Sequence, residues 1–309
     1  MLLARRLYSG DKVYLIAPAG RISKEKFSKL KTIVESFGLV PIWNDEALSG
    51  YGYFSATDAV RLDDMIKAFS HPQAKGIFCL RGGYGSTRLL KYIPYSLIRK
   101  NPKVFLGFSD VTALQMAFFK KTGLVTFHTS LNSLDHAYTA ELFKQMVFDP
   151  QEVEIPLVTD FHPSPVIIKP GSARGILVGG NLSLLVSLIG TGFLPHFRNR
   201  IVFIEEVKDP PYKIDRMLNH LFMATDIQHA AGIILGIFHG CQWQEYYETK
   251  DFAFSLEEIF EHYFNVIKGP VIYNFPLGHV EKIAVLPMGA RVYIDTDVLS
   301  LKVLNPVVK

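Results

Sequence analysis

One stretch of the chain decides the fold: Lys103-Val104-Phe105-Leu106-Gly107-Phe108-Ser109-Asp110-Val111-Thr112-Ala113-Leu114. Its first apolar residues, Val104 to Leu106, predict a short buried strand, and Gly107 allows the chain to change direction sharply. Apolar residues at helical spacing follow and predict a helix. Ser109 therefore falls between a strand and a helix, beside unpaired backbone N–H groups that suit an anion. We interpret Ser109 as a nucleophile that attacks a carbonyl whose oxygen then lies on those donors.

An alternative role for this serine is to cap the helix. Ser109 and Asp110 are both residue types that favour the N-cap position. The G-x-S-x-G signature of a nucleophile elbow is also incomplete, because Val111 stands where the second glycine belongs. The stretch by itself leaves both interpretations open.

The composition is typical of a folded globular protein. The chain has 309 residues, of which 49% are hydrophobic and 20% charged, which suggests about two domains. Its net charge is only +4 and no basic run is interleaved with aromatic residues, so we expect no nucleic-acid partner. Cys79 and Cys241 are isolated, which favours a reducing compartment over a disulfide scaffold.

The N-terminus faintly resembles a signal peptide, but Asp11 and Lys12 directly precede its short apolar run. We interpret that run as a first buried strand. No stretch approaches the ~20 apolar residues that span a bilayer, so we expect no membrane association. These features together predict a cytoplasmic protein.

Strands alternate with helices in the first half of the chain. The predicted strands there are 13–17, 40–43, 76–80, 104–106 and 125–127. The strand at 40–43 contains Pro41, which places it near a sheet edge. Such alternation indicates a parallel sheet covered on both faces.

A cluster of prolines between residues 150 and 170 then interrupts this pattern and is interpreted as a linker. Further apolar strands are predicted at 175–178, 201–204, 232–238 and 271–273, with short strands after 283. We therefore predict an α/β fold with a parallel-sheet N-terminal α/β domain over 1–150, a linker over 151–170 and a smaller C-terminal α/β domain over 171–309. The active site is expected in the cleft between the two domains.

Three residues with useful chemistry follow predicted strands, where open α/β sheets bind ligands. Ser109 follows 104–106, Glu205 follows 201–204, and His279 lies in the loop after 271–273. Serine, carboxylate and histidine in this chain order match α/β-hydrolases, with roles as nucleophile, orienting group and general base. Glu205 can instead be a solvated strand-edge charge, and His279 a loop histidine bonded to backbone. Their joint placement favours the catalytic interpretation.

The segment Arg81-Gly82-Gly83-Tyr84-Gly85 also follows a predicted strand. Paired glycines let the backbone approach a ligand and aim N–H groups at it, as in an oxyanion hole or a phosphate cradle. A dinucleotide fingerprint would need a third glycine, and the chain has no G-K-[ST] pair. Acidic residues around His262 lack the H-E-x-x-H and C-x-x-C patterns, so we expect a solvated acidic face and no metal site.

Taken together, the motifs resemble the serine LD-carboxypeptidases, which include the cytoplasmic murein tetrapeptide carboxypeptidases and the microcin C self-immunity peptidases. The resemblance rests on Arg81–Gly85, Gly107–Leu114, Gly179–Leu184, Phe203–Glu206 with Tyr212–Leu218, and Pro276–His279. These motifs keep the family's order from about residue 13 to the C-terminus. The resemblance implies a two-domain fold, a homodimer, a small peptide substrate (a muropeptide), and no metal or organic cofactor.

The resemblance also implies roles for individual residues. The family's catalytic serine, glutamate and histidine fall on Ser109, Glu205 and His279. Glu206 competes with Glu205, because the family often has Glu-Asp where this chain has Glu-Glu. The oxyanion donors correspond to the backbone N–H groups of Gly83 and Asp110. Arg81 and Tyr84 are candidates for substrate contacts. A guanidinium such as that of Arg81 pairs with a carboxylate in bidentate fashion, although an interdomain salt bridge is an alternative for it.

The implied activity is hydrolysis of the amide between an L-centre diamino acid and a terminal D-alanine in murein tetrapeptides, as part of peptidoglycan recycling. After Gly278-His279, however, the family usually has glycine and asparagine, whereas this chain has Val280-Glu281. This departure affects the substrate details more than the triad. The alternative is a microcin-immunity-type hydrolase of peptidyl or aminoacyl nucleotides, in which Trp43 or Trp243 would stack on the adenine. A non-catalytic ligand-binding protein is a third possibility.

Overall fold

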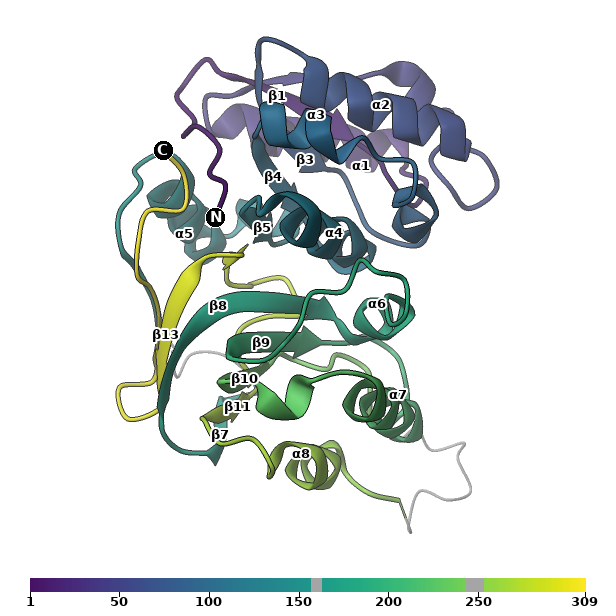
Figure 1. The fold of residues 1–309 in the computed structure, drawn as a ribbon. Coiled ribbons are helices and arrows are strands. Elements are labelled where there is room, and N and C mark those ends of the chain that lie inside the picture. The colour runs from purple at the N-terminus through teal and green to yellow at the C-terminus, as the bar shows by residue number, and fades with distance from the viewer. Residues whose placement is uncertain (157–162, 243–252) are drawn as a thin grey trace.

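The computed structural model describes residues 1–156, 163–242 and 253–309 (Figure 1). Two β-sheets lie one above the other in this view, the first built mainly from the N-terminal half of the chain and the second from the C-terminal half. This is the predicted α/β class, with an N-terminal parallel sheet. Among the described residues, none of the helices combines the length and apolar character that crossing a membrane requires.

The first sheet has the strand order β12-β5-β4-β3-β1-β2. Its parallel strands are β1 (Lys12–Ile16), β2 (Val40–Ile42), β3 (Ala74–Cys79), β4 (Val104–Gly107) and β5 (Thr126–His128). Helices pack around it: α1 (Lys24–Ser36), α2 (Asp58–Ser70), α3 (Tyr95–Lys100), α4 (Thr112–Thr122) and α5 (Ala137–Val147). Helices α1 and α2 begin at residues suited to capping, because the side chains of Ser23 and Thr57 each accept a backbone N–H of the first turn. Strand β2 lies at the sheet edge, as Pro41 predicted.

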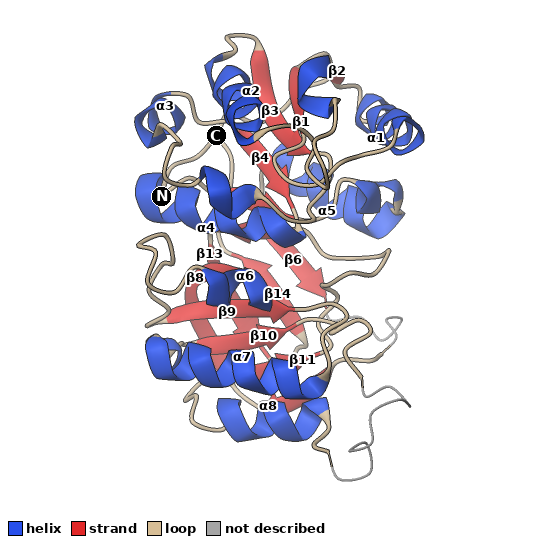
Figure 2. Cartoon of the chain, turned by 90° about the vertical axis from the view of Figure 1, so that its right-hand side faces the viewer, coloured by secondary structure: helices blue, strands red, loops and turns tan. Residues whose placement is uncertain are grey.

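The second sheet has the order β6-β14-β13-β8-β9-β10-β11-β7. Its parallel centre consists of β8 (Ser172–Asn181), β9 (Arg200–Glu205), β10 (Gly232–Leu235) and β11 (Val271–Tyr273). The outer strands are antiparallel: β6 (Val153–Pro156), β7 (Val166–Lys169), β13 (Arg291–Asp295) and β14 (Ser300–Val303). Figure 2 shows α6 (Leu182–Ser187), α7 (Pro211–Ala224) and α8 (Leu256–Phe264) on one side of this sheet.

Some segments do not follow the division of the chain that the sequence suggested. Strands β6 and β7 lie within 151–170 and belong to the second sheet. Strand β12 (Leu286–Met288) pairs antiparallel with β5 and so joins the first sheet. The chain end also returns to the N-terminal half, where Ala4 and Arg6 exchange backbone hydrogen bonds with Lys309. The domain boundaries at 150 and 170 stay a prediction.

The two sheets meet at α4, the helix that follows Ser109. Strand β8 approaches this helix closely at Gly180, where a Cβ atom would lie 2.3 Å from Cγ2 of Thr112. The hydroxyl of Thr112 accepts the backbone N–H of Asn181 at 3.1 Å. This contact brings the end of β8, and beside it the end of β9, toward the turn that carries Ser109.

Candidate active site

Ser109 lies in a strained turn between β4 and α4. Its φ is 61°, a left-handed conformation that costs a residue with a Cβ about 1–3 kcal/mol and is often found at functional sites. Gly107 makes the turn possible, because a Cβ there would lie 2.3 Å from Cγ1 of Val111. The valine that replaces the second glycine of the elbow signature therefore packs against the first glycine. The elbow forms although the signature is incomplete.

The side chains of Ser109 and Asp110 do not cap the helix. Neither the short turn Ser109–Val111 nor α4, both fully described, has a side-chain cap at its N-terminus. The hydroxyl oxygen of Ser109 lies 3.0 Å from Nε2 of His279 instead. The Asp110 carboxylate accepts the backbone N–H of Ser86 at 2.9 Å. The capping interpretation is therefore wrong for both residues.

His279 links the serine to a buried carboxylate. Its Nδ1 lies 2.8 Å from Oε2 of Glu205, the last residue of β9. The loop that carries the histidine reaches this place because Gly278, with φ 137°, packs against the backbone after β10; a Cβ on this glycine would lie 2.4 Å from the carbonyl oxygen of Ile237. When Nδ1 donates its hydrogen to Glu205, Nε2 is left to accept the serine proton. The structure thus brings all three predicted residues into one hydrogen-bonded chain.

Glu206, the competing carboxylate, points elsewhere. Its two oxygens accept hydrogen bonds from the Asn181 side chain at 2.8 Å, from Ser183 at 2.8 Å (N–H) and 2.7 Å (hydroxyl), and from the N–H of Val207 at 2.9 Å. Burial raises the pKa of Glu206, and the Ser183 hydrogen bond partly offsets this rise. Glu206 thus ties β9 to the start of α6, whereas Glu205 contacts the histidine.

The environment of His279 favours its charged form. Burial lowers the pKa of the imidazole, but the hydrogen bond and the negative charge of Glu205 raise it by more, so the net pKa lies above the ordinary 6.5. Glu205 would therefore stabilise an imidazolium at His279 if the serine lost its proton to this ring. An arrangement of this kind can perform general-base catalysis at a serine hydroxyl.

The glycine loop after β3 packs directly against the serine turn. A Cβ on Gly82 would lie 2.8 Å from Cβ of Ser109 and 3.1 Å from the backbone nitrogen of Asp110. A Cβ on Gly83 would instead face Gly20, 3.3 Å from its Cα. Within the described chain, the N–H groups of Gly83 and Asp110 donate to no protein acceptor. Both amides are therefore available to a ligand, and their role as oxyanion donors stays a prediction.

Comparison with known proteins agrees with this arrangement. The profile of the LD-carboxypeptidase N-terminal domain matches residues 13–129, and that of the C-terminal domain matches 174–294. The chain is 36% identical over 298 residues to a probable murein peptide carboxypeptidase of Bacillus subtilis, covering 94% of this chain and 91% of that protein. The chain belongs to the LD-carboxypeptidase family. It is therefore a hydrolase of the serine-type LD-carboxypeptidase class.

Solved structures of this family share the fold. An MccF-like protein from Bacillus anthracis superimposes with a TM-score of 0.86 at 28% identity, covering 99% of this chain and 100% of that one. MccF is the microcin C7 self-immunity protein. A muramoyltetrapeptide carboxypeptidase from Oxalobacter formigenes gives a TM-score of 0.80 at 26% identity, covering 94% and 97%. Both types of relative named by the resemblance are thus structurally similar to this LD-carboxypeptidase.

A pocket of about 840 Å³ opens beside Ser109 and His279 of this LD-carboxypeptidase. Glu281, which the sequence marked only as a departure from the family motif, lines the pocket. The sequence interpretation missed five further polar lining residues: Lys26, Ser130, Asn132, Ser133 and His239. Three of these directly follow β5, so applying the strand-end rule to that strand as well would have found them. His239 follows β10 in the same way, whereas Lys26 lies in the first turn of α1, where no strand-end rule applies.

The two predicted substrate contacts differ in position. Arg81 lines the pocket, and its guanidinium donates to the backbone carbonyls of Arg21 at 2.7 Å and Gly82 at 3.2 Å. Among the described residues it forms no salt bridge with the second half of the chain. Tyr84 is half-exposed, packs against Phe54 with ring centroids 5.7 Å apart, and is not part of the pocket lining. Of the two, only Arg81 is placed to meet a ligand there.

Proposed function

We propose that this LD-carboxypeptidase hydrolyses the amide between an L-centre diamino acid and the terminal D-alanine of a murein tetrapeptide. The observation that carries the proposal is the hydrogen-bonded chain of Ser109, His279 and Glu205, with contacts of 3.0 and 2.8 Å beside the pocket. The murein peptide substrate is inferred from the name of the Bacillus subtilis relative. The triad roles are inferred from the geometry and the family resemblance.

In the proposed mechanism, His279 accepts the Ser109 proton at Nε2 while the serine oxygen bonds to the scissile carbonyl carbon. The resulting oxyanion accepts hydrogen bonds from the N–H groups of Asp110 and Gly83. When the C–N bond breaks, the amine of D-alanine takes the proton from His279 and leaves. Water then gives a proton to His279 and attacks the acyl-enzyme, and the peptide acid departs as Ser109 regains its proton.

The pocket charges fit a substrate with a free carboxylate. Arg81 and Lys26 bring two positive charges to the pocket lining, and Glu281 brings one negative charge. A guanidinium binds a carboxylate through two parallel hydrogen bonds, so Arg81 is the better anchor for the terminal D-alanine. We assign substrate anchoring to Arg81 and leave Tyr84 out of this role, since it lies away from the pocket lining.

The proposal extends to the cellular setting. We infer a cytoplasmic enzyme of peptidoglycan recycling that acts as a homodimer. Its two domains are taken as 1–150 and 171–309, and the segment 151–170 between them contributes β6 and β7 to the second sheet. This inference rests on the family resemblance. The cytoplasmic location is also supported by two cysteines, Cys79 and Cys241, because both are buried and free, as expected in a reducing compartment.

The decisive experiment replaces Ser109 by alanine and follows D-alanine release from a defined murein tetrapeptide. We expect kcat to fall about a millionfold, because the serine, histidine and carboxylate act as a unit. A fluorophosphonate should add its mass to Ser109 in the wild type and not in the variant. Turnover that survives in Ser109→Ala would refute the serine mechanism.

A microcin-immunity-type hydrolase is the second candidate, favoured by the structural likeness to the Bacillus anthracis MccF-like protein. That activity calls for an aromatic residue to stack on the adenine. Phe108 lines the pocket, with its ring centroid 4.7 Å from that of His279. Trp43 donates its ring N–H to Asp45 at 2.8 Å, packs against Phe27, and is not part of the pocket lining. Trp243 lies outside the described residues. Comparing kcat/KM for a tetrapeptide and an aminoacyl sulfamoyl nucleotide separates the two functions, and we expect the tetrapeptide to be the better substrate.

A further inference from the structure

Arg61 is a buried cation next to the glycine loop. Its side chain is 0% exposed. From α2 it donates to the carbonyl oxygens of Ala56 at 3.2 Å, of Pro18, and of Gly85 at 3.0 Å, and it pairs with Asp58 at 2.5 Å. A buried charge is costly unless it is fully hydrogen-bonded, and only the planar guanidinium fork reaches several acceptors at once. The catalytic mechanism gives this residue no role.

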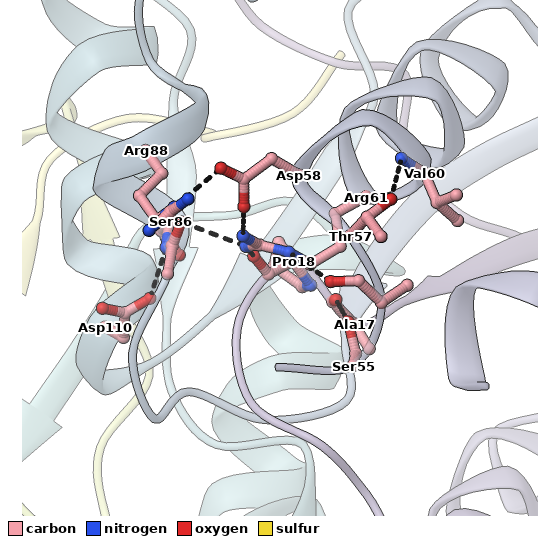
Figure 3. Close-up of polar contacts among 12 residues, drawn as sticks. Ala17, Pro18, Ser55, Thr57, Asp58, Val60, Arg61, Ser86, Arg88 and Asp110 are labelled. Carbon is pink, nitrogen blue, oxygen red and sulfur yellow. Dashed lines mark hydrogen bonds and ion pairs between the residues drawn. The ribbon is translucent and has the colours of Figure 1, made fainter. Parts of the chain in front are cut away.

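The peptide group between Gly85 and Ser86 makes two hydrogen bonds to buried side chains, one through its carbonyl oxygen and one through its N–H. The carbonyl oxygen of the Gly85–Ser86 peptide accepts the hydrogen bond from Arg61, and the N–H of that peptide donates to the Asp110 carboxylate at 2.9 Å. Asp110 is 1% exposed and directly follows Ser109. Figure 3 shows Arg61 and Asp110 on opposite sides of Ser86. One peptide at the end of the glycine loop is therefore held between a buried cation and a buried anion.

The local shape is built around this contact. Gly85 has φ 135°, and a Cβ there would lie 2.7 Å from Nη1 of Arg61 and 2.9 Å from the Phe54 ring. The Phe54 ring in turn lies 4.6 Å from the guanidinium carbon. The beginning of the loop is tied to the same region, because Gly20 donates its N–H to the carbonyl of Gly82 at 3.1 Å. Both ends of the loop are thus anchored to the segment after β1, one of them through Arg61 and Pro18.

We propose that Arg61 and the Asp110 carboxylate are positioning residues that fix the Gly85–Ser86 peptide and so set the distance between the glycine loop and Ser109. The inference rests on the proposed function, in which N–H groups of this loop and of Asp110 hold the oxyanion. Neither side chain contacts the substrate. Their effect is on transition-state stabilisation, because a donor displaced by a fraction of an ångström no longer meets the oxyanion.

The test compares Arg61→Lys, Asp110→Asn and the double variant. The lysine ammonium cannot bond the carbonyls of Pro18, Ala56 and Gly85 together with Asp58, so the loop loses one of its anchors. We expect kcat for D-alanine release to fall roughly 10- to 100-fold in Arg61→Lys with KM changed less than about threefold, which is the pattern for loss of an interaction made only in the transition state. The asparagine of Asp110→Asn still offers an oxygen that can accept the N–H of Ser86, so kcat should fall less in this variant.

Coupling between the two sites distinguishes positioning from general destabilisation. Because both side chains hold one peptide, the double variant should lose less than the product of the two single losses. All kcat values are expressed per serine labelled by a fluorophosphonate, so that unfolded molecules are not counted. The matched control is Arg200→Lys, the same change at a guanidinium that lies 5.1 Å from the Phe119 ring and does not line the Ser109 pocket. We expect its kcat to equal that of the wild type.

The possible outcomes are distinct. A folded Arg61→Lys variant with wild-type kcat per labelled serine overturns the inference, as does full independence of the two substitutions in the double variant. If Arg61→Lys does not fold, Asp110→Asn decides by itself: a lowered kcat supports the inference and an unchanged kcat overturns it. A wild-type enzyme that releases no D-alanine and is not labelled at Ser109 refutes the proposed function instead.

Discussion

The two sides of the Ser109 pocket contribute different kinds of groups to the site. On the side of the first sheet, the contributions are mostly backbone: the strained turn of Ser109, the N–H of Asp110, and a glycine loop packed against both. On the side of the second sheet, they are ionisable side chains, Glu205 and His279. In the proposed mechanism this difference is a division of roles: the side of the first sheet supplies fixed backbone geometry, and the side of the second sheet supplies the groups that would transfer the proton.

The two sides are also assembled differently. The backbone groups come from the ends of β3 and β4, which are adjacent parallel strands, so the loops that follow them lie together. Glu205 and His279 are 74 residues apart and meet because β9, β10 and β11 are neighbours in the second sheet. Each side can therefore be weakened separately by substitution.

The largest difference is expected between the two adjacent glutamates of the second sheet. Glu205→Gln removes the charge that orients and stabilises His279, so we expect kcat to fall by roughly 10⁴-fold, as for the orienting carboxylate of other triads. Glu206→Gln changes a carboxylate bonded to Asn181 and Ser183 and should lower kcat less than about tenfold. Steady-state kinetics with a murein tetrapeptide measures both, with thermal unfolding as the control for folding. Equal losses would contradict the assignment of Glu205 to His279.

The pH profile tests the same carboxylate through the histidine. The pKa of His279 lies above 6.5 because the effect of Glu205 exceeds that of burial. The base must be neutral to act, so kcat/KM of the wild type should decline below a pKa higher than 6.5. In Glu205→Gln the hydrogen bond and charge of Glu205 are lost, and burial then opposes only the smaller effect of Glu206 on the pKa of His279, so the acid limb should move to lower pH. An acid limb at the same pH in both enzymes would show that another group titrates.

A smaller effect is expected from adding a methyl group on the side of the first sheet. In Gly82→Ala the new Cβ would lie 2.8 Å from Cβ of Ser109 and 3.0 Å from the carbonyl oxygen of Phe108, so the loop must shift away. Displacement of one oxyanion donor costs about 10²–10³-fold in kcat. The control is Gly192→Ala, which has open space around it and φ 78°, and so should lower stability but not kcat. Unchanged kcat in Gly82→Ala would separate this loop from catalysis.

The smallest expected effect is on stability and concerns Asp64, a buried carboxylate in the first half of the chain. Asp64 accepts fewer hydrogen bonds than Glu206 does. Asp64 of α2 accepts the Tyr14 hydroxyl at 3.1 Å, and burial raises its pKa from 3.8 to about 7. Between these values the folded state binds more protons than the unfolded state, so this group makes stability fall as pH rises. The free energy of unfolding of Asp64→Asn, relative to that of the wild type, should therefore increase by roughly 1–3 kcal/mol from pH 5 to pH 8. Urea unfolding at both pH values measures this, and a constant difference would contradict it.

By itself, the sequence determined the secondary structure of the first sheet and the set of candidate residues. Hydrophobic periodicity and the residues that begin and end helices act over a few positions, so the turn at Ser109, the glycine loop and the strand ends were all predictable. The family motifs then identified the class of enzyme, which the comparisons confirm.

Only the tertiary structure decided which of two adjacent residues in the sequence contacts the site. Adjacent residues of an extended chain point in opposite directions, so Glu205 and Glu206 are equivalent in sequence but contact His279 and α6 respectively. In the same way, Gly82 packs against Ser109 while Gly83 faces Gly20, and Tyr84 lies away from the pocket lining. The pairing of β12 with β5 and the contact between Arg61 and Gly85 join distant segments. Such contacts depend on packing between elements, and no local pattern encodes them.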